Sequence, residues 1–172
     1  MYIYPNDSDE ISRSSEASKL KNNPSETLTE LDHQIIASLQ EDSRLSLSKI
    51  ADKLGTSVST AQKHIKKLED KGVLKGYTAI IDPTKLGYCV TAIVLIQVEG
   101  GHLLNVENEI AKEDNVLAVY DITGDYDAAV VTKFKDTGGL NAFVKRLLSM
   151  RYVKRTVTNV AFNVIKEEFT PI

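Results

Sequence analysis

The sequence has 172 residues, of which 42% are hydrophobic and 26% are charged, and its formal net charge at pH 7 is −3. This balance is typical of one or two soluble globular domains, and the negative total excludes a protein that coats nucleic acid without selectivity. No apolar run approaches the roughly 20 residues that cross a bilayer, and the opening stretch MYIYPNDSDE lacks the pattern of a signal peptide. We therefore expect a cytoplasmic protein with no membrane partner.

The cysteine and histidine content argues against a metal or redox centre. Cys89 is the single cysteine, so it can form neither an intrachain disulfide nor a zinc site built on paired thiols. The three histidines, His33, His64 and His102, lie far apart in the sequence and do not have the spacing of metal ligands. We expect no metal and no cofactor, and we expect Cys89 to be a small buried apolar residue.

Residues 1–26 are polar and rich in serine, with two prolines and few large apolar side chains. Such a segment cannot bury enough apolar surface to offset the entropy lost on ordering. The composition therefore predicts a flexible N-terminal tail.

A helical pattern begins at the end of this tail. Thr27 and Glu30 have the spacing of a capping box, and Leu31, Ile35 and Leu39 then recur at the interval of an amphipathic helix. We predict that a first helix starts here and that residues 27–76 form a helix-turn-helix domain.

Two further short helices follow within this domain. The stretch LSKIADKL has one apolar stripe and stops at Gly55, a residue that suits a left-handed C-cap. After the turn, Ser57 or Ser59 can cap a third helix, which ends near Gly72. Three short helices with a tight second turn predict a helix-turn-helix, of the winged type.

The third helix would meet double-stranded DNA, because the second helix of such a motif enters the major groove. Between Ser59 and Lys75 there are five lysines and two acidic residues, which gives this segment a local charge of +3. Lysines on an exposed helix face are often merely solvated, so the context of the motif carries the argument. The candidate DNA-binding residues are Ser57, Ser59, Thr60, Gln62, Lys63, His64, Lys66 and Lys67.

Within this set, the lysines and the serines at the helix start suit phosphate contacts. Gln62, Lys63 and His64 are the candidates for reading base edges. His64 lies at the border of the apolar stripe, so packing against the first helix is an equally open role for it.

After Gly76 the pattern changes from helical to strand-like. In residues 77–87, YTAIID predicts a short hinge strand and DPTKLG a turn, which together link the two domains. In residues 88–172 the predicted order is strand, helix, strand, strand, helix, strand. This order predicts an α+β fold with a ferredoxin-like βαββαβ domain, in which two helices cover one face of a four-stranded antiparallel sheet.

The first strand of this domain, YCVTAIVLIQVEG, is apolar on both faces. The helices can cover only one face of the sheet, so the other face would leave apolar side chains open to solvent. We therefore expect a homodimer.

Gly124 and Asp125 predict a hairpin turn, which exposes backbone amides beside acidic side chains. This mixture suits a zwitterion, because carboxylates accept from an α-ammonium group and amides donate to an α-carboxylate. The alternative is that these residues only form the hairpin and that Asp127 caps it. The candidate effector-binding residues are Gly124, Asp125, Tyr126, Asp127, Thr156, Thr158 and Asn159.

Four stretches form a pattern that extends over both predicted domains. They are ADKLGTSVSTAQKHIKKLED in residues 51–70, GVLKGY in 72–77, TGDYD in 123–127 and RTVTNV in 155–160. Together they resemble the leucine-responsive/asparagine-regulator (Lrp/AsnC) family of transcriptional regulators. The resemblance covers about residues 28–168. It implies a sequence-specific regulator that binds operator DNA, forms dimers through its C-terminal sheets, often assembles into tetramers or octamers, and responds to an amino-acid effector held between dimers.

The sequence departs from the family at two informative positions. His64 stands where the family commonly has an arginine, whose guanidinium can bind guanine or phosphate through two hydrogen bonds. Tyr152-Val153 replaces a common Gly-Val before the last strand.

Two alternatives come from other classes of protein. Siroheme decarboxylases share this two-domain plan, but the only histidine after Tyr77 is His102, and the sequence shows no nucleophile and base pair. An architectural DNA-binding protein would bind without sequence preference, so a comparison of specific with random duplex across salt concentrations separates it from a regulator.

Overall fold

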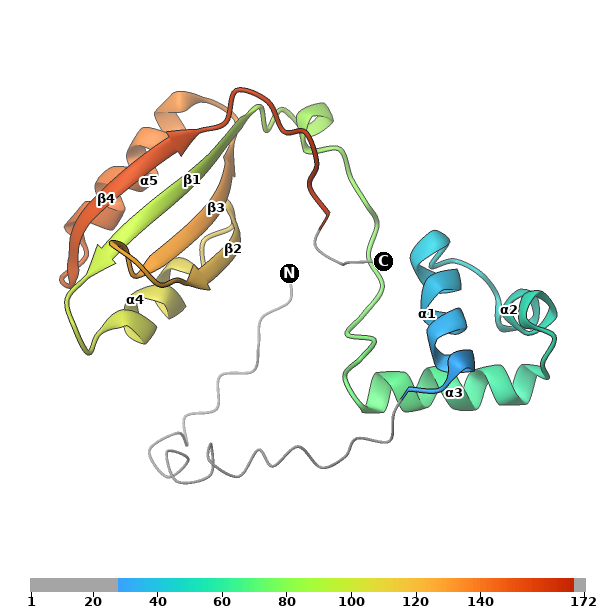
Figure 1. The fold of residues 1–172 in the computed structure, drawn as a ribbon. Coiled ribbons are helices and arrows are strands. Elements are labelled where there is room, and N and C mark those ends of the chain that lie inside the picture. Colours follow the sequence, from blue (N-terminus) through green and yellow to red (C-terminus); the bar gives the residue numbers. More distant parts are fainter. Residues whose placement is uncertain (1–27, 169–172) are drawn as a thin grey trace. The chain divides into compact units, whose positions relative to one another are not determined.

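The computed structural model describes residues 28–168, which form two compact units divided between Ile80 and Ile81 (Figure 1). The predicted tail in residues 1–26 and the proposed cap Thr27 lie outside the described residues. Each unit has its own apolar core, and the two are described in turn.

The first unit contains three helices, α1 (Glu30–Glu41), α2 (Leu47–Leu54) and α3 (Val58–Asp70). The capping box at the start of α1 is formed by Thr29 and Asp32, not by Thr27 and Glu30 as the sequence predicted. The Thr29 hydroxyl accepts from the backbone N–H of Asp32, and the Asp32 carboxylate accepts from the backbone N–H of Thr29. The shorter aspartate side chain thus takes the part that the motif usually gives to glutamate.

The turn between α2 and α3 follows the predicted chemistry. Gly55 ends α2 with φ of 63°, in the left-handed region that a Cβ atom disfavours. Ser57, the first of the two predicted caps, accepts from the backbone N–H of Thr60 at the start of α3. Gly72 follows the end of α3 with φ of 66°.

A small core holds the three helices together. It consists of buried apolar side chains from all three helices, so each helix depends on the other two. Its members are Ile35, Leu39, Ile50, Ala51, Ala61, Ile65 and Leu68.

The segment after α3 differs from the prediction. Residues 77–82 form no strand, although YTAIID predicted one, and residues 71–82 contain no β-hairpin wing. A strand needs a partner for its backbone hydrogen bonds, and the rest of the described chain offers none at this segment. The predicted turn in DPTKLG is a 3-10 helix, Pro83–Leu86, which the Asp82 side chain caps through the backbone N–H of Thr84.

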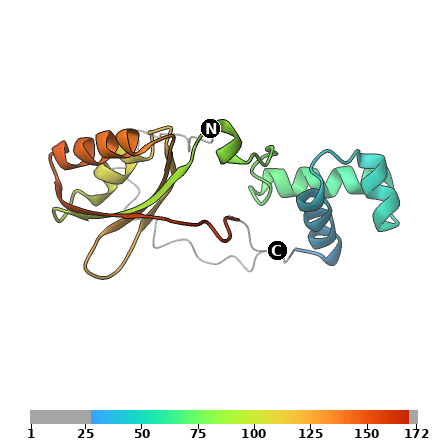
Figure 2. The same cartoon turned by 90° about the horizontal axis from the view of Figure 1, so that it is seen from above.

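The second unit confirms the βαββαβ order. Its elements are β1 (Val90–Val98), α4 (Leu103–Ile110), β2 (Val116–Asp121), β3 (Ala128–Phe134), α5 (Thr137–Ser149) and β4 (Val153–Val160). The strands lie in the order β2-β3-β1-β4 and every neighbouring pair is antiparallel. Figure 2 shows both helices on one side of the sheet. The fold is therefore α+β and ferredoxin-like, as predicted.

The central strand β1 alternates between the two faces of the sheet. Ala92, Val94 and Ile96 are fully buried in the core formed with α4 and α5. Ile93 faces the other way and remains 43% exposed. This second face, which we call the open face, carries the side chains that the helices leave uncovered.

Cys89 is exposed, although the sequence reasoning placed it in the core. It precedes β1 by one residue, at a point where the chain has not yet entered the sheet.

Candidate DNA-binding helix and effector site

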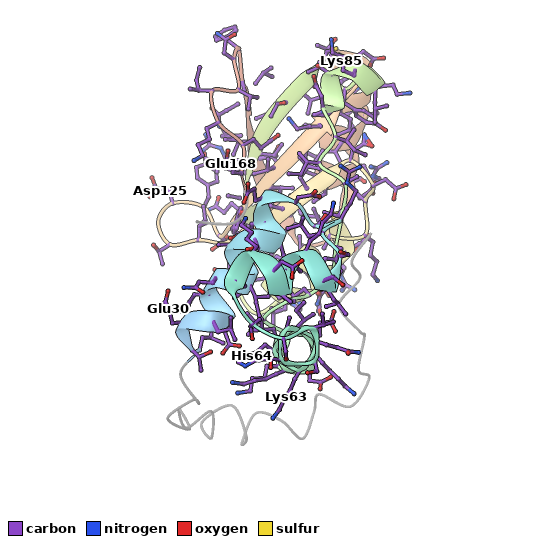
Figure 3. The ribbon with its side chains drawn as sticks, turned by 90° about the vertical axis from the view of Figure 1, so that its right-hand side faces the viewer. Glu30, Lys63, His64, Lys85, Asp125 and Glu168 are labelled. Carbon is purple, nitrogen blue, oxygen red and sulfur yellow. The ribbon has the colours of Figure 1, made fainter. Side chains whose placement is uncertain are left out.

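The surface of α3 carries the predicted DNA-binding residues in two groups. Side chains in the first group are exposed, and those in the second are partly buried. The exposed group is Ser57, Ser59, Gln62, Lys63 and Lys66, and the partly buried group is Thr60, His64 and Lys67. In Figure 3, Lys63 lies on the side of α3 away from α1 and α2, whereas His64 lies on its flank.

Hydroxyl groups gather at the start of α3. The Ser57 Oγ lies 2.9 Å from Ser59 Oγ and 2.8 Å from Thr60 Oγ1. The first N–H groups of a helix, together with its dipole, favour an anion at this end. The start of α3 therefore offers hydrogen bonds and positive potential suited to a backbone phosphate.

His64 and Lys67 contact a buried carboxylate on α1. Asp32 has no exposed surface, and its Oδ1 lies 2.7 Å from His64 Nδ1. Lys67 Nζ lies 3.5 Å from Asp32 Oδ2. The sequence left open whether His64 packs against the first helix, and the structure shows that it does. The sequence did not predict Asp32 as the residue that His64 contacts.

Two groups of Thr29 complete the surroundings of the carboxylate. The backbone N–H and the hydroxyl of Thr29 both donate to Asp32 Oδ2, at 2.8 and 2.9 Å. Burial by itself would raise the pKa of the Asp32 carboxyl, but the hydrogen bonds it accepts and the nearby Lys67 ammonium outweigh burial and hold this pKa well below its usual range. Asp32 is therefore a buried anion that ties α1 to α3.

The predicted hairpin joins β2 to β3. Gly124 has φ of 123°, and Asp125 is exposed at the loop that Figure 3 shows projecting from the sheet. Asp127 has a structural part, because its Oδ2 accepts from the backbone N–H of Val98 at 2.7 Å. Its own backbone N–H donates to the Ile96 carbonyl. The hairpin is thus fastened to the end of β1, which agrees with the capping alternative for Asp127.

The three predicted effector residues on β4 do not share a face. Directly paired residues of antiparallel strands point to the same side of a sheet. Thr156 and Thr158 pair with Ile96 and Val94, whose side chains lie under the helices, whereas Asn159 pairs with Ile93 on the open face. Within one chain, these side chains therefore do not converge.

Arg155 contacts the predicted site residue Tyr126, a contact that the sequence analysis did not predict. Its guanidinium lies 5.8 Å from the centre of the Tyr126 ring, within the range of a cation–π contact. Arg155 pairs with Gln97 in the sheet register, while Tyr126 belongs to the hairpin. The available signal was the two-residue period of a strand: Arg155 lies four residues before the predicted Asn159, so the two share a face of β4.

Tyr152, which stands where the family commonly has a glycine, contacts His102 through its side chain. The Tyr152 ring stacks on the His102 ring, with centroids 3.6 Å apart and planes 7° apart. The Tyr152 carbonyl also accepts from the backbone N–H of Glu99. His102 is thereby placed beside an aromatic ring at the start of α4.

On the open face, Lys133 joins β1 to the chain that follows β4. The Lys133 side chain is nearly buried, and its ammonium lies 3.0 Å from both Thr91 Oγ1 and Glu167 Oε2. The chain after β4 therefore returns to the sheet at β3. An open depression beside the Lys133–Glu167 contact is lined by Tyr120, Val131 and residues 166–168.

Residues 28–168 contain neither a cluster of metal-ligating side chains nor a helix that could span a membrane. They contain no group of three or more histidine, cysteine or acidic side chains arranged to hold a metal ion. None of their helices combines the length and apolar composition that crossing a membrane requires.

Comparison with known proteins places both units in families. Residues 28–75 match the model of a winged helix-turn-helix DNA-binding domain, and residues 91–171 match that of the Lrp/AsnC ligand binding domain. An HTH-type transcriptional regulator of Pyrococcus furiosus is 44% identical over 142 residues, which cover 83% of this chain and 96% of that protein.

Solved structures share this fold over most of the chain. An AsnC family transcriptional regulator from Agrobacterium tumefaciens has a TM-score of 0.77 at 27% identity, covering 84% of this chain and 96% of its own. A transcriptional regulator of Neisseria meningitidis, solved in complex with L-methionine, has the same fold with a TM-score of 0.77 at 24% identity, covering 85% and 97%. The chain therefore belongs to the Lrp/AsnC family of transcriptional regulators, which join a helix-turn-helix DNA-binding domain to a ligand-binding domain.

Proposed function

We propose that this regulator acts in the cytoplasm, reads a specific operator with α3, and changes its DNA affinity or assembly when an amino acid binds. The observation that carries the DNA-binding part is the exposed basic face of α3, with Gln62, Lys63 and Lys66 projecting from a helix whose start is capped by Ser57. Lysines there meet phosphates, and Gln62 and Lys63 reach base edges.

The DNA-binding proposal is tested by selecting duplexes from a random pool with the full-length protein. The recovered sequence is then used to measure affinity across salt concentrations. Lys63→Ala and Lys66→Ala should each reduce the slope of log affinity against log salt by about 1, because each removes one positive charge from the face that meets the phosphate backbone. Lys85→Ala is the matched control, since Lys85 is exposed in the 3-10 helix outside the helix-turn-helix and should leave the slope unchanged.

Two outcomes would contradict the proposal. Equal recovery of all duplexes would favour an architectural DNA-binding protein instead of a regulator. An unchanged salt slope in both lysine variants would remove α3 as the DNA-contacting element.

For the effector, we propose a small zwitterion bound near the hairpin. The methionine complex of the Neisseria protein supports an amino acid, and the exposed Asp125 supplies a carboxylate for its ammonium group. The predicted residues on β4 lie on both faces of the sheet, so a site that uses them all would need a second copy of the chain.

Titration calorimetry with the twenty amino acids tests this part. Asp125→Ala should abolish the heat of binding of the active amino acid without changing the melting temperature, because Asp125 is exposed. Asp114→Ala, an exposed aspartate of the same unit, is the control. Equal binding by the Asp125→Ala variant would exclude the hairpin carboxylate as a contact.

We propose further that two chains pair through the open face and that dimers assemble into tetramers or octamers. Ile93 at the centre of this face is 43% exposed, and burying it against a second sheet removes apolar surface from water. In sedimentation velocity, Ile93→Asp should yield monomers. Leu104→Asp, on α4 and 72% exposed, should leave the assembly unchanged.

A further inference from the structure

We propose that Asp32 is a positioning residue for DNA recognition, which holds the His64 ring by Nδ1 so that its Nε2 reads one base pair. The proposal rests on the proposed function, because it assumes that α3 enters the major groove. It assigns to a buried residue of α1 a part in the sequence preference of α3, and it makes His64 and Asp32 one recognition unit.

The first step is the saturation of the Asp32 carboxylate. Its Oδ1 accepts from His64, and its Oδ2 accepts two hydrogen bonds from Thr29 and faces the Lys67 ammonium. A carboxylate with no exposed surface is costly unless donors surround it in this way. Asp32 is therefore fixed on α1 by its own capping box, and it forms a rigid acceptor for groups on α3.

The second step concerns the orientation of the His64 ring. A contact of 2.7 Å between Nδ1 and a carboxylate oxygen restricts rotation of the ring about both of its side-chain torsions. The His64 side chain is 22% exposed, and within residues 28–168 no hydrogen bond is recorded for its Nε2. The contact with Asp32 thus leaves Nε2 as the ring nitrogen available to a ligand.

The third step is the chemistry of that nitrogen. Since the carboxylate accepts, Nδ1 carries a hydrogen, and the neutral ring then presents Nε2 as an acceptor. One nitrogen makes one hydrogen bond, whereas an arginine at the same position could make two to a guanine. We expect a preference of about fivefold at one base pair, at the low end of what a single contact to a base edge contributes.

Lys67 is the second group that Asp32 withdraws from the DNA face. Its ammonium lies 3.5 Å from Asp32 Oδ2 and its side chain is 30% exposed. The charge of Lys67 compensates the buried carboxylate, so Lys67 should contribute less to phosphate binding than the exposed Lys66. Lys67→Met should therefore change the salt slope less than Lys66→Met does.

The deciding experiment repeats the selection from random duplexes with full-length His64→Ala, Asp32→Asn and the double variant. In Asp32→Asn the amide oxygen should keep the two Thr29 donors, which turns the NH2 group toward His64, so the ring loses its acceptor at Nδ1. We therefore expect His64→Ala and Asp32→Asn to lose the preference at the same base pair and to keep it elsewhere, and we expect the double variant to lose nothing more. A merely structural part for Asp32 would weaken the preference at every position. Thermal unfolding of each variant is measured in parallel.

A measurement on the unsubstituted protein covers the case in which Asp32→Asn does not fold. Nitrogen-15 NMR of the His64 ring should show the proton on Nδ1 in the neutral form. A proton on Nε2, or an Asp32→Asn variant that folds and keeps the base preference lost in His64→Ala, would overturn the proposal. Failure of the unsubstituted protein to select any sequence would instead refute the proposed function.

Discussion

The core of the helix-turn-helix is small enough that one truncation should remove more than half of the unit's stability. Leu68 on α3 has no exposed surface and is one of the seven buried apolar residues of this unit. Leu68→Ala removes three carbons, worth about 0.8 kcal/mol each, and leaves a cavity, so we expect a loss of about 3 kcal/mol. A unit of this size has a free energy of unfolding of about 5 kcal/mol. The substitution should therefore increase its unfolded population on the order of a hundredfold.

Hydrogen exchange followed by mass spectrometry measures this change in each unit separately. Amides of α1 and α3 should exchange on the order of a hundredfold faster in Leu68→Ala, while those of β1 and α5 keep their protection. Leu104→Ala is the matched control, because Leu104 is 72% exposed on α4. Its effect should be within about 0.5 kcal/mol.

Two results would refute this reasoning. Less than fivefold faster exchange in α1 and α3 would mean that the cavity collapses or that Leu68 packs loosely. An equal loss of protection in β1 and α5 would mean that the two units unfold together, so that the core of the first unit is not independent.

Three further outcomes are expected. The folded-state pKa of Asp32 is depressed, so its contribution to stability is complete above the unfolded pKa of about 4 and is lost as pH falls below it; thermal melts between pH 2.5 and 7 should show this loss, and Asp32→Asn should flatten it. Asp127→Ala leaves the Val98 N–H without its acceptor and should cost about 1–3 kcal/mol in chemical unfolding, whereas Asp127→Asn retains an acceptor oxygen and should cost less. Gly55→Ala should cost about 1–2 kcal/mol because φ is 63° there, and Gly100→Ala, where φ is not positive and the added Cβ also meets nothing, should be nearly neutral in the same melts.

The features that the sequence predicted well depend on neighbours within a few residues. Gly55 and Ser57 end and start helices through contacts inside the same turn, and the alternation in β1 separates its two faces without reference to other strands. The first capping box shows the limit of such rules. Thr29 and Asp32 have the same spacing as Thr27 and Glu30, and the usual preference for glutamate pointed to the wrong pair.

The features that the sequence could not predict depend on distant partners. Asp32 and His64 are 32 residues apart, so no local pattern identifies their contact. Residues 77–82 have a strand-like composition, but composition supplies no strand to pair with. Cys89 is apolar enough for a core, yet its exposure follows from where β1 begins.

The faces on which the three candidate effector residues of β4 lie could have been predicted from the sequence alone. Residues two apart in a strand share a face, so Thr156 and Thr158 had to lie together and Asn159 opposite. The contact between Arg155 and Tyr126 follows the same rule, but it also required the position of the hairpin, which the register of β2 and β3 determines.

The strand order β2-β3-β1-β4 leaves β2 and β4 with unpaired backbone groups along one edge each. β4 carries Lys154 and Arg155, and charged side chains on an edge discourage pairing with another molecule. β2 has the sequence VLAVYD, with its only charge at the last residue, and Leu117 within it is 45% exposed. When the protein is heated or concentrated, irreversible aggregation should therefore begin along β2, and a lysine in place of Leu117 is the change that would protect this edge in preparations for crystallography or NMR.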